Sequence, residues 1–211
     1  MERPILERIG DSVGSGAPKG VIMALTESTM MPLGTQAPEF TLPEPLTGKT
    51  WSLEQLQGVF ATLVVFMCNH CPYVKHVMEG ITELSSEYML EGVSVIAINS
   101  NDVDSYPEDS PENMAALAAK EHFLFHYLYD ESQQVAQAYR AACTPDFFLF
   151  DDELKCVYRG RLDAATPGND IPVTGQDLRD AIDAVLKGKS VPGEQKPSLG
   201  CNIKWKEIAP S

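Results

Sequence analysis

The sequence predicts an α/β domain in which strands and helices alternate around a parallel sheet. Two apolar runs, 60–67 and 93–99, have the length and β-branched content of strands that are buried on both faces. Between them, apolar residues recur at helical spacing over 74–88. A strand, a helix and a second strand in this order form a β-α-β unit, whose two strands run parallel.

The other elements are predicted from turn residues and shorter patterns. A hairpin precedes the β-α-β unit, with strands at 39–42 and 50–52 around two prolines and Gly48. After it we expect, in chain order, a helix that begins at Ser110-Pro111, a strand at 125–129, a helix at 133–140, an antiparallel hairpin with strands at 147–150 and 154–159, and a last helix capped by Thr174.

The 211 residues are enough for one well-buried domain with extensions. Residues 1–33 are expected to form a disordered or loosely attached extension, because glycine and proline are frequent there and apolar periodicity is missing. Residues 34–190 are expected to form the domain, and 191–211 a C-terminal tail packed on it. The apolar run 21–25 is too short for a signal peptide or a membrane anchor, so we expect a cytoplasmic protein.

Composition excludes several classes of partner. The net charge of −14 opposes binding to nucleic acid and to anionic membrane surfaces. The five cysteines are an odd number, so a fully paired secreted disulfide framework is not implied. The sequence leaves the oligomeric state open.

Cys68 and Cys71 form the motif Cys-Asn-His-Cys between the first buried strand and the predicted helix. Two thiols at this spacing and in this position are placed to form and break a disulfide. The partial positive charge of a helix N-terminus favours the thiolate, which is the reactive form. Pro72 fits this position, because proline is tolerated in the first helical turn. The sequence therefore predicts that Cys68 and Cys71 are catalytic, with Cys68 at the helix N-cap, facing solvent.

The same spacing also begins many zinc sites, so a metal-binding or metallochaperone module is an alternative function. A closed zinc site needs four ligands, usually with a second short cysteine pair. The other cysteines stand alone at 143, 156 and 201, although His70 and His76 could add ligands. We favour the redox interpretation, with no metal and no cofactor, because the motif joins a strand to a helix.

With this motif in place, the order of predicted elements resembles the thioredoxin fold. Thr144-Pro145, just before a predicted strand, matches the cis-proline loop that faces the dithiol in that superfamily. The segments 66–74, 99–102, 144–148 and 200–205 are similar to a group of bacterial peroxiredoxin-like proteins with a thioredoxin domain. The resemblance implies a thioredoxin-like fold with an N-terminal β-hairpin extension and an α-β insertion, in the redoxin branch that contains alkyl hydroperoxide reductase and thiol-specific antioxidant proteins.

This resemblance implies a thiol-disulfide oxidoreductase in which Cys68 attacks and Cys71 resolves. Its partners would be a protein or small-molecule disulfide and a thiol electron donor such as a thioredoxin. Thr144 and Pro145 would form a substrate-facing loop, where the Thr144 backbone could pair with an incoming peptide. A peroxiredoxin-like thiol peroxidase is the alternative. It takes second place because Val65 stands where peroxiredoxins carry a Thr or Ser, three residues before the peroxidatic cysteine.

His70 is predicted to tune the dithiol. An imidazolium beside Cys68 would lower the thiol pKa and make the pair more oxidising than thioredoxin, whose potential is about −270 mV. Among the other cysteines, Cys143 is favoured as a buried residue over a third redox thiol, and Cys156 is expected in the core on the same strand face as Tyr158. The role of Cys201 is left open. The acidic stretch 102–112 is expected to overhang the site without supplying a catalytic residue.

Overall fold

The structure is a computed structural model that describes residues 25–207. Its centre is a five-stranded sheet in the order β6-β5-β4-β8-β9. The parallel strands are β4 (Ala61–Phe66), β5 (Val93–Asn99) and β6 (His126–Tyr129), and the antiparallel ones are β8 (Asp146–Asp151) and β9 (Cys156–Gly160). This arrangement confirms the predicted α/β class and the predicted strands.

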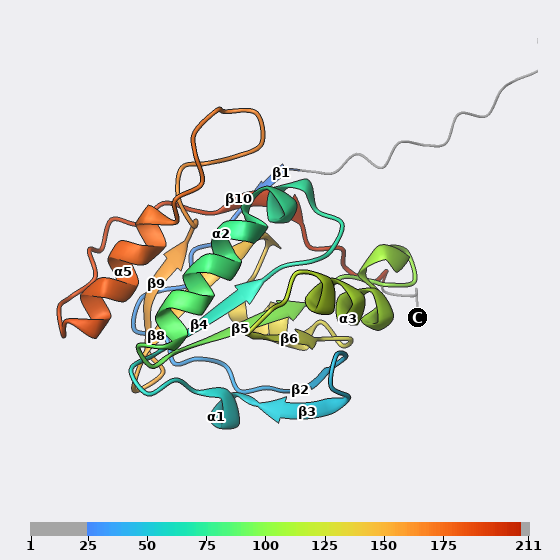
Figure 1. The fold of residues 1–211 in the computed structure, drawn as a ribbon, viewed down its shortest axis with the longest axis horizontal. Helices are drawn as coiled ribbons and strands as arrows, with labels where there is room; N and C mark the ends of the chain where they lie inside the picture. Colours follow the sequence, from blue (N-terminus) through green and yellow to red (C-terminus); the bar gives the residue numbers. More distant parts are fainter. Residues whose placement is uncertain (1–24, 208–211) are drawn as a thin grey trace, which may run out of the picture.

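Helices and a hairpin cover the two faces of this sheet (Figure 1). One face carries α2 (Pro72–Met89), α3 (Pro111–Lys120) and α5 (Gln176–Leu186). The other face carries the predicted hairpin, β2 (Thr41–Glu44) with β3 (Lys49–Ser52), together with α1 (Leu53–Leu56) and α4 (Gln134–Tyr139). The 3-10 helix η1 (Pro107–Asp109) lies in the connection between β5 and α3.

The central strand β4 fixes the position of the C-x-x-C motif. All six of its residues are buried, as expected for a strand between two layers. Leu63 and Val65 pack under α2, whereas Val64 and Phe66 pack into the core on the opposite face. Because each buried side chain of this kind contributes about 1.5–3 kcal/mol, the strand is firmly held and the residues after Phe66 leave it at a defined point.

A second, three-stranded sheet forms from segments that are far apart in the sequence. Its order is β1 (Leu25–Glu27), β10 (Leu199–Asn202) and β7 (Cys143–Thr144), with both pairings antiparallel. The prediction that residues 1–33 are loosely attached is therefore wrong for 25–33, because β1 pairs with β10 and Met31 is buried. Residues 1–24 and 208–211 lie outside the described part of the chain.

The last helix starts one residue later than predicted. Gly175, with φ of 69°, is the N-cap of α5 in place of Thr174. Asp163 accepts hydrogen bonds from the backbone N–H groups of Thr174 and Gly175, at 2.7 and 2.6 Å. A glycine adopts this left-handed conformation without strain, so an aspartate distant in sequence holds the turn that the local pattern assigned to threonine. Among residues 25–207, no helix is long and apolar enough to cross a membrane.

Candidate active site

The two cysteines of the C-x-x-C motif lie at the junction of β4 and α2. Cys68 follows the end of β4 by two residues, and Cys71 is the N-cap of α2, with Pro72 in the first turn. Both cysteines are fully buried. The prediction that Cys68 occupies the N-cap and faces solvent is therefore wrong, because the helix begins only at Pro72 and makes Cys71 its first flanking residue.

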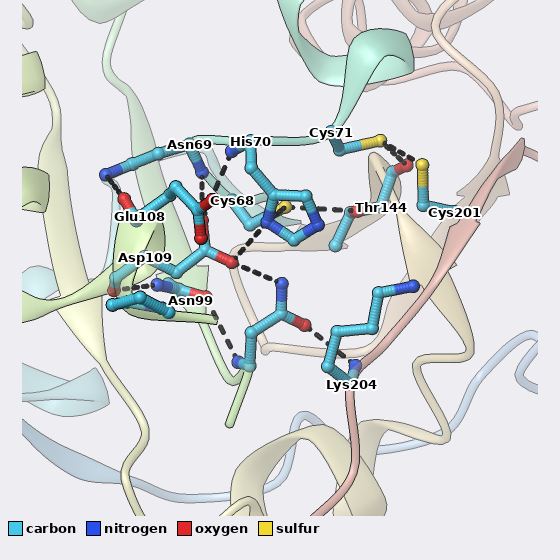
Figure 2. A network of polar contacts seen from close by, with 12 residues as sticks. Cys68, Asn69, His70, Cys71, Asn99, Glu108, Asp109, Thr144, Cys201 and Lys204 are labelled. Carbon is cyan, nitrogen blue, oxygen red and sulfur yellow. Dashed lines mark hydrogen bonds and ion pairs between the residues drawn. The ribbon is translucent and has the colours of Figure 1, made fainter. Parts of the chain in front are cut away.

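The proline loop lies against both sulfur atoms, as predicted. The Thr144-Pro145 peptide bond is cis. Thr144 Oγ1 lies 3.5 Å from Cys68 Sγ, and the Thr144 carbonyl oxygen lies 3.2 Å from Cys71 Sγ (Figure 2). One residue of the loop thus contacts both thiols, although it is more than seventy residues away in the sequence.

The backbone edge of this loop is occupied by the chain itself. Thr144 stands opposite Cys201 in the antiparallel pairing of β7 with β10. Gly200 makes the pairing possible, because a Cβ there would lie 2.0 Å from the Thr144 carbonyl oxygen. The expectation that Thr144 offers a free edge to an incoming peptide is therefore wrong for this structure. The edge is taken by β10.

Cys201 is the third thiol of the site. Its sulfur lies 2.8 Å from Cys71 Sγ, and Figure 2 shows the two sulfur atoms pointing toward each other. Cys143 is also buried, but its sulfur faces the carbonyl oxygen of Pro145, at 3.6 Å. The burial of Cys143 agrees with its interpretation from the sequence as a buried residue. No local sequence pattern indicated that Cys201 belongs to the site. All five cysteines are free thiols.

His70 joins the dithiol to a buried carboxylate. Its Nδ1 lies 3.9 Å from Cys68 Sγ and 2.6 Å from Asp109 Oδ2 (Figure 2). Asp109 belongs to η1 and is fully buried. The acidic stretch 102–112, which was expected to overhang the site and to which no catalytic residue was assigned, brings this carboxylate into the site. A usable signal was the sheet topology, because loops after neighbouring parallel strands lie at the same edge.

Asp109 organises the motif as well as contacting its histidine. Its Oδ1 accepts hydrogen bonds from the backbone N–H groups of Asn69 and His70, at 2.8 and 3.2 Å. Its Oδ2 accepts one from the Asn101 side chain at 2.8 Å, and its backbone carbonyl accepts one from Asn99. The carboxylate therefore fixes the backbone between the two cysteines in one conformation.

Two further side chains close the site around His70. The Tyr106 ring stacks on the imidazole, with centroids 5.3 Å apart and an interplanar angle of 13°. Lys204 Nζ lies 5.5 Å from the centroid of the Tyr106 ring. A cavity of about 290 Å³ is lined by Pro145 and Tyr73 among others, but neither cysteine of the motif lines it. The reduced dithiol is thus enclosed.

The surroundings shift the two thiols in opposite directions. Burial, the adjacent Cys71 and the charge of Asp109 raise the pKa of Cys68 well above its ordinary value. Contacts with the Cys201 and Cys68 thiols, and a hydrogen bond from the Val74 backbone at the helix start, lower the pKa of Cys71. The predicted lowering of the Cys68 pKa is wrong in direction, because burial, the adjacent Cys71 and the Asp109 carboxylate all raise this pKa.

Three side chains have the donor atoms for a metal ion. Cys68 Sγ, His70 Nδ1 and Asp109 Oδ2 lie within 4.8 Å of one another. Cys71 is not a member of this group. The three donors therefore differ from the ligand set that the C-x-x-C spacing suggests, which contains both cysteines. Both carboxylate oxygens of Asp109 already accept two hydrogen bonds each. A metal ion would have to displace the bond between Asp109 and His70.

The sheet order, the motif at the end of β4 and the proline loop against it define a protein with the thioredoxin fold. The redoxin family matches residues 32–178, and the chain belongs to this family. Family membership supports a thiol redox function. A search of curated proteins found no match.

Solved structures agree with this assignment. The crystal structure of an uncharacterized conserved protein from Geobacillus kaustophilus is 56% identical, with 89% of this chain and 99% of that chain covered and a TM-score of 0.87. The crystal structure of a hypothetical protein from Sinorhizobium meliloti is 48% identical. The match covers 86% of this chain and 98% of that chain, with a TM-score of 0.84. The crystal structure of a putative thiol:disulfide interchange protein DsbE from Chlorobium tepidum is 21% identical. The match covers 74% of this chain and 99% of that chain with a TM-score of 0.60, and it shows a likeness of fold alone.

Proposed function

We propose that this protein is a thiol-disulfide oxidoreductase that cycles Cys68 and Cys71 between dithiol and disulfide. The observation that carries the proposal is the contact of Thr144 with both sulfur atoms, at 3.5 and 3.2 Å. This contact brings the proline loop, the end of β4 and the start of α2 to one point. Two buried thiols at C-x-x-C spacing, both in contact with this loop, are placed to form a disulfide with each other.

The reaction exchanges one disulfide for another. One thiolate of the pair attacks a disulfide R–S–S–R′, forms a mixed disulfide and releases R′–S⁻, which takes up a proton. The second sulfur then loses its proton, attacks the mixed disulfide and releases R–S⁻. The Cys68–Cys71 bond forms, the substrate gains two electrons and two protons, and a thiol donor such as a thioredoxin returns the pair to the dithiol.

The enclosure of the dithiol constrains its substrate. A protein or small-molecule disulfide reaches the sulfur atoms only if the stacked pair of His70 and Tyr106, or strand β10, moves aside. A small disulfide needs the smaller movement, because it requires no free backbone edge on β7. We therefore expect small disulfides to react faster than disulfides in folded proteins.

The test is a redox titration against glutathione buffers, with free thiols alkylated and counted by mass. We expect the wild-type protein to lose two thiols in one transition. Cys71→Ser should lose that transition, and Cys68→Ser should lose the Cys68–Cys71 disulfide that peptide mass identifies in the wild-type protein. Cys156→Ala is the matched control, because Cys156 is buried in the core on the opposite face of the sheet. Unchanged thiol counts in the wild-type protein across the titration would refute the proposal.

A thiol peroxidase is the second candidate, supported by the Thr144 hydroxyl. That oxygen lies 3.5 Å from Cys68 Sγ. A hydroxyl group, which Val65 cannot provide, is thus supplied by the proline loop. The assay is hydrogen peroxide consumption with a dithiol as reductant. If the protein is a peroxidase, Thr144→Val should slow peroxide consumption and leave exchange with glutathione disulfide nearly unchanged.

The metal-binding alternative is tested on the same samples. Protein purified under reducing conditions is analysed for bound zinc and copper. The variant Asp109→Asn distinguishes a site that contains Asp109 from a site formed by the two cysteines of the motif. Binding through Cys68, His70 and Asp109 is lost in that variant, whereas binding through the two cysteines is retained.

A further inference from the structure

We propose that Cys201 is a third redox thiol, which attacks the Cys68–Cys71 disulfide and moves the bond to Cys71–Cys201. This inference deepens the proposed function and rests on it. It assigns chemistry to the C-terminal strand β10, which lies beside the dithiol and joins the two sheet segments β1 and β7.

The first support is the geometry of the two sulfur atoms. Cys201 Sγ lies 2.8 Å from Cys71 Sγ, compared with about 2.05 Å in a disulfide bond. Cys71 is therefore within reach of two different thiols, Cys68 in its own motif and Cys201 on β10. Figure 2 shows Cys71 between the Thr144 carbonyl oxygen and the Cys201 sulfur.

The second support is the way in which β10 is held. Cys201 is paired on both sides, with Leu25 of β1 and with Thr144 of β7. Gly200 lets β10 approach the Thr144 carbonyl more closely than any residue with a Cβ would allow. Cys201 is 2% exposed, so this thiol is fixed against the dithiol by backbone pairing and packing. A thiol in an unattached tail would have neither constraint.

The step is an internal exchange without net oxidation. Cys201 gives up its proton, and its sulfur attacks Cys71 Sγ of the Cys68–Cys71 disulfide. The Cys71–Cys201 bond forms, the Cys68–Cys71 bond breaks, and Cys68 leaves as a thiolate that takes up a proton. One disulfide and one thiol are present before and after. The consequence is that oxidised protein can present Cys68 as a free thiol.

Tryptic peptides separate the two disulfides. Cys68 and Cys71 lie together on peptide 50–75, and Cys201 lies on 190–204, because the Lys196-Pro197 bond resists trypsin. Wild-type protein is oxidised with glutathione disulfide, freed of reagent, and incubated with excess iodoacetamide, which traps Cys68 whenever it is released. We expect peptides 50–75 and 190–204 to become linked while Cys68 gains the label.

Variants identify the thiol that is responsible. Cys68→Ser, oxidised in the same way, gives the linked pair as a reference. Cys201→Ser should lose both the link and the labelling of Cys68, whereas Cys143→Ser, which removes another buried thiol near the proline loop, should keep both. The wild-type experiment needs no substitution, so it decides the question even if a variant fails to fold.

Two results overturn the inference in distinguishable ways. If the wild-type peptide 50–75 keeps its internal disulfide, and Cys201 takes the label or no thiol does, the exchange does not occur and the proposed function stands. If the oxidised wild-type protein contains neither disulfide, the proposed function and the inference fail together.

Discussion

Asp109 acts on the dithiol in two ways. It holds the backbone of Asn69 and His70 through hydrogen bonds, and its charge raises the pKa of Cys68. These effects have opposite consequences for reactivity, because the first keeps the motif in one conformation and the second disfavours the Cys68 thiolate. A substitution that keeps the shape of the side chain but removes its charge separates them.

We expect Asp109→Asn to lower the pKa of Cys68, because the negative charge of Asp109, one of the causes of its raised pKa, is removed while burial remains. Replacing one accepting oxygen also leaves a buried donor unpaired, at a cost of about 1–3 kcal/mol in unfolding free energy. The measurement is the pH dependence of Cys68 alkylation, mapped by peptide mass. Asp104→Asn, an exposed change in the same connection, is the control. A Cys68 profile that does not move toward lower pH would contradict this role.

A second residue-scale prediction concerns which sulfur carries the charge. Cys71 is the N-cap of α2 and contacts the Cys201 thiol, which lowers the pKa of Cys71, so we expect Cys71 to be the thiolate of the reduced protein. Thiolate absorbance near 240 nm should vanish in Cys71→Ser and persist in Cys68→Ser at neutral pH. The reverse pattern would restore Cys68 as the thiolate, as the sequence suggested.

Local spacing was enough to single out Cys68 and Cys71, because a strand-to-helix junction is visible within a few residues. Thr144 and Pro145 were singled out by the resemblance to the thioredoxin fold. Asp109 and Cys201 could not be found from local spacing. Asp109 reaches His70 across 39 positions and Cys201 reaches Cys71 across 130. Contacts at such separations depend on strand pairing and loop course, which local patterns do not encode.

At the level of elements, β10 has the largest influence on the site. It pairs with β7, covers the edge beside the dithiol and carries Cys201. The prediction placed residues 191–211 in a tail packed on the domain, but its four-residue strand has too few alternating residues to be recognised from the sequence. Pairing with the two-residue strand β7 becomes visible only in three dimensions.

A β-bulge explains another difference between pattern and structure. In the pairing of β8 with β9, Leu149 stands opposite Tyr158 and Phe150 opposite Cys156, so Val157 is an extra residue. Cys156 and Tyr158 therefore face opposite sides of the sheet, although a regular alternation would place them together. The expectation that Cys156 is buried was right, and its assignment to the face of Tyr158 was wrong.

Gly200→Ala tests the close approach of β10 to β7. The added Cβ would lie 2.0 Å from a backbone oxygen, so β10 must move away from Thr144. We expect a loss of about 1–3 kcal/mol in unfolding free energy and a higher pKa for Cys71, since its contact with Cys201 lengthens. Urea denaturation and thiolate absorbance measure the two effects. Gly193→Ala is the matched control, because a Cβ there meets nothing within 4 Å. Equal effects of the two substitutions would contradict the role of Gly200.

The stability of the whole molecule is tied to pH through Asp146, which follows the proline loop. This side chain is fully buried, and burial raises its pKa to about 7, although hydrogen bonds from Ser28 and the backbone oppose the shift. Ser28 also accepts a hydrogen bond from the Ser198 backbone, so the carboxyl group lies where the two ends of the described chain meet the central sheet.

The sign of the pH effect follows from the raised pKa. Below about pH 4 the group is protonated in both the folded and the unfolded state, so it costs nothing. Between about pH 4 and 7 only the unfolded chain ionises it, and stability falls by about 1.4 kcal/mol per pH unit. Above pH 7 the folded protein carries the buried charge and the loss is complete.

We therefore expect the unfolding free energy of the wild-type protein to fall by about 2–3 kcal/mol between pH 5 and 7 because of this single group. Asp146→Asn cannot ionise, so its stability should vary less with pH and should exceed that of the wild type most clearly at pH 8. Urea denaturation at pH 5, 6, 7 and 8 measures the difference. Asp152→Asn, an exposed change in the turn after β8, should leave the wild-type slope unaltered. Parallel pH profiles for the wild type and Asp146→Asn would show that the buried carboxyl group is not the origin of the dependence.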